Sequence, residues 1–476
     1  VNKLLISENN NAQATYSGVN AFYSSGFGLG SGNEFNQSSQ TFASWTFRKA
    51  EKFFTCLTYT GDGTVGRNIS HNLDATVGMM ILKETSGSGY WGVYHRSVDS
   101  TSPEDYVLLL NSTSARIDEQ FFINDPAPTS THFTVGAAAA SGGDFNTNGD
   151  TYVAYLFAHN DGDGEFGPDA DQDIIKCGSV SYPASGDVEV NLGFEPQWVL
   201  YKDVTHSGNN WWILDTMRGW NAQETSGTFS STTGGNAKAL FSDTSGAEVE
   251  YDYGALTSTG FKLPSNFNYG DNNTDFIYVA IRRGTAVPTS ATEVFANQFG
   301  SASPQPWFKS SFSPDMALYK KVTGTGNWSI ASRLTGPNEL NTNSTGAEQP
   351  NSSARFDFQN GFYANSGSTT DWMSWHWKRA KGAFDCVAYT GNGTNGRAIS
   401  HNLGVAPEMI WIKNRDDSTD WAVRVPNALS SYKELKLNDS SAANFWNYIQ
   451  GQSETTFTVG NNGSVNHSSG NTYIAY

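Results

Sequence analysis

The densest group of residues able to do chemistry lies in one acidic stretch, residues 160–173. The stretch reads Asn-Asp-Gly-Asp-Gly-Glu-Phe-Gly-Pro-Asp-Ala-Asp-Gln-Asp, and acidic residues at alternate positions with Gly between them resemble the start of calcium-binding loops. It lacks the closing Glu of an EF-hand. Two interpretations therefore stay open, a solvated acidic linker and a Ca²⁺ site. The candidate ligands are the carboxylates of Asp161, Asp163, Glu165, Asp169, Asp171 and Asp173.

Aromatic side chains form the second set of candidates. A tryptophan offers a flat apolar face to sugar C–H groups, and its N–H can bond a sugar hydroxyl. Tryptophans without a counterpart elsewhere in the chain fit such a role better than repeated ones. The candidates for glycan contact are Trp212, Trp220, Trp307 and Trp446.

Signatures of catalysis are missing from the sequence. It contains no G-x-S-x-G, no H-E-x-x-H, no P-loop and no zinc spacing. His71 and His401 share the sequence Ser-His-Asn-Leu, but a third, related stretch has Val190 in their place, which favours packing in a turn. We expect no enzyme.

The cysteines begin similar stretches and are expected to be small buried residues in a chain folded in a reducing cytoplasm: Cys56, Cys177 and Cys386.

Charge and composition limit the partners. Lys and Arg number 29 against 46 Asp and Glu, so the net charge is −17, which argues against nucleic acid and anionic membranes. No apolar run is long enough to span a membrane. Aromatic residues make up 13% and charged residues only 16%, and this balance excludes a mainly disordered chain.

A long internal repeat organises the chain. Residues 44–56 (SWTFRKAEKFFTC) match residues 374–386 (SWHWKRAKGAFDC) at an offset of 330, and Ile-Ser-His-Asn-Leu recurs unchanged at the same offset. Within this period a shorter motif, two apolar residues and a Lys followed about eight residues later by a Trp, occurs four times. Its lysines are Lys83, Lys202, Lys320 and Lys413, and its tryptophans, which we expect in the core, are Trp91, Trp211, Trp328 and Trp421.

The repeat predicts four units and two partial elements. Residues 1–48, the N-terminal segment, resemble the C-terminal part of a preceding unit. The units are unit 1 (49–158), unit 2 (174–284), unit 3 (285–378) and unit 4 (379–476, cut at its end), with an acidic linker at 159–173. Because both ends cut through the repeat, we expect the sequence to be a window on a longer polypeptide.

Each unit has the pattern of a β-sandwich. In unit 1, about seven short stretches rich in aromatic and β-branched residues are separated by Gly, Ser, Asn and Asp. The continuous apolar run 77–82 predicts a central strand buried on both faces. Helical periodicity is scarce. We predict an all-β protein of tandem β-sandwich (jelly-roll or lectin-like) modules in an elongated array.

Three stretches carry a resemblance to a known family. They are the repeated W-x-x-x-R-A…YTG…ISHNL block, the linker NDGDGEFGPDADQDIIKCGS and the junction IRRGTAVPTSATEVFA. Together they resemble tandem repeats in tail-fibre and other structural proteins of marine bacteriophages, especially cyanophages. The resemblance implies a virion component in a tail or fibre, extracellular after release, with other virion proteins as partners. By analogy it also implies a homo-oligomer, commonly a trimer.

Three functions are weighed from these observations. The first is a tail-fibre or tail-appendage segment that attaches to host-surface glycans. The second is a purely structural virion component, such as a collar, head fibre or decoration, without receptor contact. The third is a depolymerase that cuts surface polysaccharide. The first is favoured, because modules in a row with variable loops suit repeated weak attachment.

Overall fold

The computed structural model describes most of the chain. The described residues are 3–119, 123, 126–136, 145–167, 169–183, 186–222, 237–264, 274–284, 286–351, 353–364, 370–429, 433–467 and 470–476. Nearly all regular structure in these residues is β-strand, and the α-helix α1 (Asn33–Asn36) has four residues. The predicted fold class, tandem β-sandwich modules, is confirmed.

Unit 1 consists of a six-stranded antiparallel sheet and a two-stranded one. The larger sheet has the order β10-β9-β8-β7-β12-β5, and the smaller pairs β11 with β6. The bounds are β5 (Phe54–Thr60), β6 (Arg67–Ser70), β7 (Val77–Glu84), β8 (Trp91–His95), the 3-10 helix η1 (Pro103–Asp105), β9 (Tyr106–Leu109), β10 (Ile117–Asp118), β11 (His132–Val135) and β12 (Thr151–Ala158).

Unit 2 repeats this arrangement. Its six-stranded sheet has the order β13-β21-β15-β16-β17-β18, and its three-stranded sheet the order β14-β20-β19. The bounds are β13 (Ile175–Ser181), β14 (Val188–Asn191), β15 (Pro196–Asp203), β16 (Trp211–Asp215), η2 (Thr216–Arg218), β17 (Ala237–Phe241), β18 (Val249–Tyr251), β19 (Ala255–Thr257), β20 (Gly260–Leu263) and β21 (Asp275–Arg282).

Units 3 and 4 also each contain two sheets. Unit 3 has the orders β22-β29-β24-β25-β26-β27 and β23-β28, and unit 4 has β30-β37-β32-β33-β34 and β31-β36-β35. The bounds in unit 3 are η3 (Ala291–Glu293), β22 (Phe295–Phe299), β23 (Phe308–Lys309), β24 (Met316–Lys321), β25 (Ser329–Ser332), η4 (Arg333–Thr335), β26 (Asn338–Asn341), β27 (Gln349–Pro350), β28 (Gly361–Phe362) and β29 (Trp372–Trp377). Those in unit 4 are β30 (Val387–Thr390), β31 (Arg397–Ser400), β32 (Ile410–Asn414), β33 (Ala422–Arg424), β34 (Leu435–Lys436), β35 (Ile449–Gln452), β36 (Thr456–Val459) and β37 (Thr472–Ala475).

One strand order recurs in all four larger sheets. The first strand of each unit lies at the edge and pairs with the last strand, which in turn pairs with the third. The N-terminal segment contains two hairpins, β1 (Lys3–Leu4) with β2 (Ala14–Thr15) and β3 (Val19–Tyr23) with β4 (Gly26–Leu29). In unit 2 the pairs β17–β18 and β19–β20 follow one another in the same way, so this segment is built like the second half of a unit.

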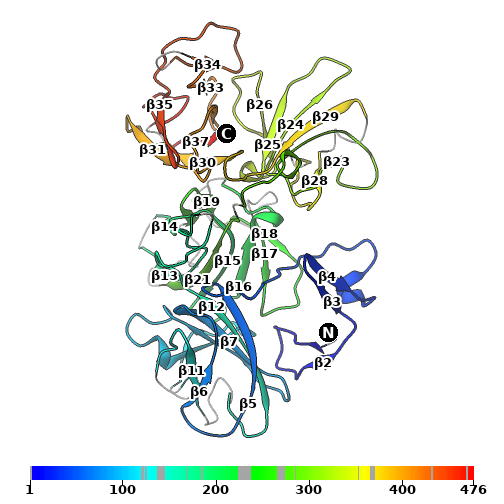
Figure 1. The fold of residues 1–476 in the computed structure, drawn as a ribbon, viewed down its shortest axis with the longest axis vertical. Coiled ribbons are helices and arrows are strands. Elements are labelled where there is room, and N and C mark those ends of the chain that lie inside the picture. The colour runs from blue at the N-terminus through cyan, green and yellow to red at the C-terminus, as the bar shows by residue number, and fades with distance from the viewer. Residues whose placement is uncertain are drawn as a thin grey trace.

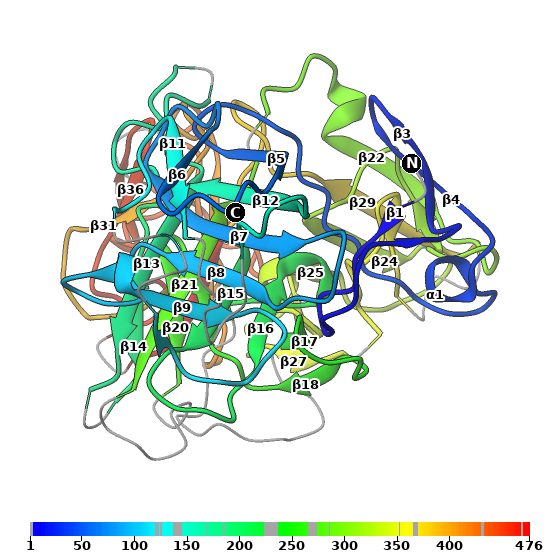
Figure 2. The same cartoon turned by 90° about the horizontal axis from the view of Figure 1, so that it is seen from below.

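The units are stacked and then paired (Figure 1). Unit 1 lies at one end of the long axis, unit 2 beside it, and units 3 and 4 lie next to each other at the other end. The N-terminal segment lies to one side, away from the sheets of unit 4 (Figure 2). Hydrophobic cores cross the boundaries between units: one joins residues of units 1 and 2, and another joins residues of units 2, 3 and 4.

Stacking explains why the central strands are buried on both faces. Seven of the eight residues of β7 are buried, as its unbroken apolar run predicts. Leu82 and Met80 point into the core of unit 1, whereas Ile81 and Met79 lie on the other face of the sheet. Residues of both faces belong to a single core that includes Trp198 and Trp211 of unit 2. The outer face of one sheet is therefore covered by the neighbouring unit.

Candidate functional site

Two aromatic patches contain the candidate tryptophans that are partly exposed, Trp307 and Trp446. The first lies in unit 3, where the ring of Trp307 contacts that of Tyr363 at a centroid distance of 4.5 Å. The guanidinium of Arg355 lies 4.1 Å from the centre of the Tyr363 ring. The indole nitrogen of Trp307 is buried and has no hydrogen-bond partner among the described residues. Because this nitrogen is inaccessible to solvent in this structure, the patch offers a sugar the partly exposed rings and the exposed guanidinium of Arg355.

The second patch lies in unit 4. Trp446 is half-buried and stacks on Tyr448, with ring centres 5.9 Å apart. The neighbouring Phe445 is 59% exposed. Two cations accompany these rings: the ammonium of Lys436 lies 4.9 Å from the Trp446 ring centre, and that of Lys433 lies 6.0 Å from the Phe445 ring centre. Aromatic faces and ammonium groups together suit a sugar that carries an acidic group.

The other two candidate tryptophans are in the core. Trp212 is 3% exposed and stacks on Tyr201, and Trp220 is 0% exposed, with its indole N–H donated to the carbonyl of Gly254. Neither ring offers a face to a sugar in this structure. Trp212 follows the repeated Trp211 in β16, and because successive side chains in a strand alternate, the two rings enter the cores on opposite sides of the sheet.

The acidic stretch pairs with lysines rather than folding around a common centre. Glu165 lies 2.9 Å from the ammonium of Lys52, and Asp169 forms an ion pair with Lys381 of unit 4. Asp173 accepts hydrogen bonds from the backbone N–H groups of Gly162 and Gly164. The stretch therefore helps to join units 1, 2 and 4.

The six predicted calcium ligands are all within the described residues. Asp161 and Asp173 both approach Lys176, at 3.8 and 3.5 Å. Across the residues that the structure describes, no group of three or more His, Cys, Asp or Glu side chains is placed to hold a metal ion. The described acidic side chains pair with lysines, and the calcium site stays a prediction.

The repeated Lys–Trp motif forms a contact between units, which we call the connector. At three junctions the indole N–H of the repeated Trp donates to a backbone carbonyl of the neighbouring unit. A second hydrogen bond runs in the opposite direction. The residue seven positions after the acceptor donates its backbone N–H to the backbone carbonyl of the residue that lies two positions after the repeated Lys. The carbonyls that accept from Trp91, Trp211 and Trp421 belong to Ile6, Leu109 and Asn341, at 3.2, 2.9 and 3.0 Å. The N–H donors are Gln13, Arg116 and Glu348, which reach Thr85, Val204 and Arg415 at 3.0, 3.0 and 2.7 Å.

The lysine of the motif supports the same contact. Lys83, Lys202 and Lys413 are 0% exposed. Lys83 donates to the carbonyl of Asn10 in the N-terminal segment, and Lys202 donates to that of Thr113 in unit 1. Burial lowers the pKa of Lys202 to about 8, although Asp203 and Asp243 oppose this shift. Trp91, Trp211 and Trp421 are buried as expected, and the structure adds that they connect neighbouring units. Trp328, also expected in the core, is only half-buried, because no described acceptor from a neighbouring unit meets it.

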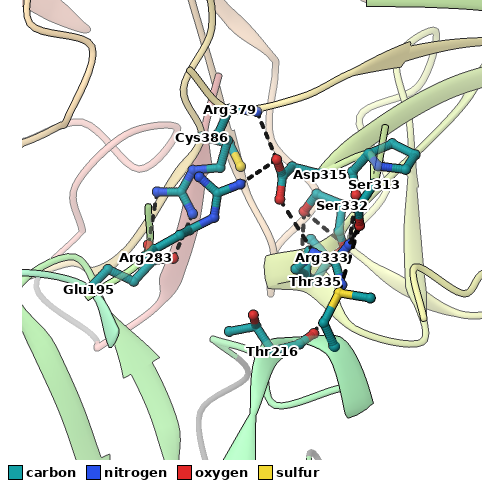
Figure 3. A network of polar contacts seen from close by, with 12 residues as sticks. Glu195, Thr216, Arg283, Ser313, Asp315, Ser332, Arg333, Thr335, Arg379 and Cys386 are labelled. Atoms are coloured by element: carbon teal, nitrogen blue, oxygen red, sulfur yellow. Dashed lines mark hydrogen bonds and ion pairs between the residues drawn. The ribbon is translucent and has the colours of Figure 1, made fainter. Parts of the chain in front are cut away.

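A buried ion-pair network joins units 2, 3 and 4 (Figure 3). The guanidinium of Arg379 donates to both carboxylate oxygens of Glu195, at 2.6 and 3.0 Å, and to Asp385 at 2.6 Å. Asp315 accepts from the backbone N–H of Arg379 at 2.7 Å and pairs with Arg333 at 3.3 Å. These side chains come from three different units, so the network fixes the units relative to one another.

Charges in the network compensate one another. Burial would lower the pKa of Arg379, but Glu195 and Asp385 hold it well above its ordinary value. Burial would raise the pKa of Asp315, but Arg283, Arg333 and Arg379 hold it below its ordinary value. Sequence reasoning missed this network. Its one visible signal is that Arg379 lies in the repeated SWHWKRA block and Arg283 in the IRRGTAVP junction.

The two repeated histidines lie in identical turns. The Nδ1 atoms of His71 and His401 each accept the backbone N–H two residues later, at 3.2 Å, and each ring stacks on a phenylalanine. Asp74 follows the turn with φ of 52°, where unit 4 has Gly404 with φ of 70°. The geometry agrees with the expected packing role.

The geometry defines a class of protein: tandem β-sandwiches locked together by connectors and buried ion pairs, with aromatic patches at their loops. No helix in the described parts of the chain is long and apolar enough to cross a membrane. A protein family described as a domain of unknown function (DUF7483) matches residues 1–283 and 293–476, and the chain belongs to this family. Searches of curated proteins and of solved structures found no match.

Proposed function

We propose that the chain is a structural segment of a bacteriophage virion, in a tail fibre or tail appendage, that attaches to host-surface glycans without catalysis. The observation that carries the proposal is the connector, repeated at three junctions, together with the aromatic patches at Trp307 and Trp446 and the cations beside them. The resemblance of the repeat blocks to marine phage tail proteins supports a virion context.

A fixed arrangement of units suits such a role. Each connector replaces a flexible link by hydrogen bonds between buried groups, so neighbouring units keep one relative orientation. Weak sites held at fixed positions on several copies of a fibre bind together through effective concentration. The net charge of −17 opposes self-association at high local concentration.

We assign the glycan sites to the two partly exposed aromatic patches. The patch of unit 4 combines Phe445 and Trp446 with Lys433 and Lys436, and this combination favours sugars that carry a carboxylate or sulfate. The patch of unit 3, with Trp307 and Tyr363, supplies a second site on the neighbouring unit.

A glycan array that includes acidic host polysaccharides tests the proposal. The double variant Phe445→Ala/Trp446→Ala is expected to lose binding while its thermal unfolding stays close to that of the parent chain. Phe22→Ala is the matched control, because Phe22 is 68% exposed in the N-terminal segment and belongs to neither patch.

Two results would favour the other functions. No binding to any glycan, combined with labelling of the chain near the capsid in intact particles, would favour a purely structural component. New reducing ends, or a fall in the viscosity of host polysaccharide, would favour a depolymerase.

A further inference from the structure

The connector site of unit 3 is open. Its tryptophan, Trp328, is half-buried, and its indole N–H has no acceptor in the described part of the chain. Val322, two residues after Lys320, is 48% exposed. The equivalent Val204 of unit 2 is 1% exposed because a loop of unit 1 covers it. Unit 3 therefore presents a connector site that none of the described residues of a neighbouring unit occupies.

A second open feature lies beside it, in unit 4. In unit 1 the strand β12 runs on past Tyr155, and Leu156 and Phe157 pair with β5 on one side and β7 on the other. The matching place in unit 4, after Tyr476, is a cavity of about 680 Å³. Its lining is mostly apolar and includes Phe384, Met409, Ile410 and Trp377. The cavity has the position that Leu156 and Phe157 of β12 take in unit 1.

The N-terminal segment shows what such a surface binds. Trp45 and Phe47 correspond to Trp375 and Trp377 of unit 3 at the offset of 330. The indole N–H of Trp45 donates to Asp215 of unit 2 at 3.0 Å, and Phe47 packs against Trp198 of unit 2. The N-terminal segment and unit 1 thus hold unit 2 between them.

Unit 3 contains the residues equivalent to Trp45 and Phe47, namely Trp375 and Trp377. Trp375 and Trp377 are half-buried, and the ring of Trp375 lies against that of Trp328 at a centroid distance of 5.4 Å, tilted by 34°. Unit 3 corresponds to the N-terminal segment and unit 4 to unit 1, because both pairs are related by the long period. We propose that units 3 and 4 bind a further β-sandwich unit of the class of unit 2, in the place that unit 2 takes against residues 3–48 and unit 1.

The chemistry of the partner follows from the connector. Such a unit offers a backbone carbonyl to Trp328 and, seven residues later, a backbone N–H to the carbonyl of Val322. In unit 2 these positions are Phe241 and Glu248, and Glu248 lies at an exposed place in its loop. The segment that leads into the unit supplies an apolar strand for the cavity beside β37. The proposal concerns assembly and does not depend on glycan binding.

The test extends the full chain at Tyr476 with a second copy of residues 156–284, because Tyr476 corresponds to Tyr155. Val322→Cys is introduced in the parent and in the extended chain, and its reaction with a thiol reagent is followed. In the extended chain we expect the reaction to slow by about tenfold or more, since a covered site reacts only through local opening. Val65→Cys in unit 1, where Val65 is 61% exposed, should react equally in both chains.

A second variant tests the connector itself. Replacing the copied Glu248 by Pro in the appended unit removes the N–H donor and should restore most of the reactivity of Cys at position 322. An appended unit that folds while position 322 stays fully reactive overturns the proposal. So does an appended unit that stays protease-sensitive, because the same sequence folds as unit 2. In the parent chain, the reaction of the cysteine at position 322 could instead slow as the protein concentration rises. That result would identify a second copy of the chain as the occupant and would also overturn the proposal.

Discussion

Removing the Arg379 side chain should separate the units that its ion pairs join. The side chain is 5% exposed, and the carboxylates of Glu195 and Asp385 beside it are 4% and 9% exposed. In Arg379→Met two buried carboxylates lose their cation. Breaking a buried ion pair from one side typically costs about 3–5 kcal/mol, since the remaining charge is left desolvated.

Calorimetry is the suitable measurement, because a chain of several units need not unfold in one step. For a cooperative block of roughly 200 residues, a loss of about 3–5 kcal/mol corresponds to a fall in Tm of roughly 6–20 °C. The transitions of units 2 and 4 should also move apart. The double variant Glu195→Gln/Arg379→Met should recover part of the loss, because it removes one of the unpaired charges.

The matched control is the exposed pair Lys321–Asp371, at 3.1 Å, whose side chains are 43% and 29% exposed. Lys321→Met should change the stability by less than about 1 kcal/mol. If Arg379→Met were no more destabilising than this control, or if the double variant were worse than the single one, the reasoning on buried charge would be wrong.

Two further predictions concern the connector and pH. Trp211→Phe leaves the buried carbonyl of Leu109 without its donor and should lower the free energy of unfolding by about 1–3 kcal/mol. Trp328→Phe, at the open site, should change the free energy of unfolding by less than about 0.5 kcal/mol. Calorimetry of the two variants tests this difference. Burial lowers the pKa of His95 to about 3 and of His376 to about 4. The unfolded chain therefore binds more protons below about pH 6.5, so stability should fall from there toward pH 4, less steeply in His95→Gln and His376→Gln. A Tm independent of pH in this range would contradict this.

The repeat was sufficient to predict the fold class. Turn residues at short intervals and alternating aromatic stretches require short strands, and copies of one pattern require copies of one sandwich. The burial of β7 on both faces followed from its apolar run. These features depend on residues close together in the chain, where the sequence pattern is a direct record of the structure.

The candidate site was predicted less well. Trp212 was placed among the glycan candidates because it has no repeat partner, but β16 has apolar residues at consecutive positions and is covered on both faces. Trp307 and Trp446 are partly accessible, but no local sequence pattern indicates that cations approach these patches, as Arg355 approaches Tyr363 and Lys436 approaches Trp446.

The sequence alone determined that the chain is a series of β-sandwiches with an unusual surface charge and a recurring Lys–Trp pair. Only the tertiary structure decided what that pair does: it carries a hydrogen bond to the next unit, as Trp211 does to Leu109. It also decided that Glu195 meets Arg379, although 184 positions separate them in the chain. The physical reason is that contacts between units join residues far apart in the chain, and which residues meet depends on how the folded surfaces fit.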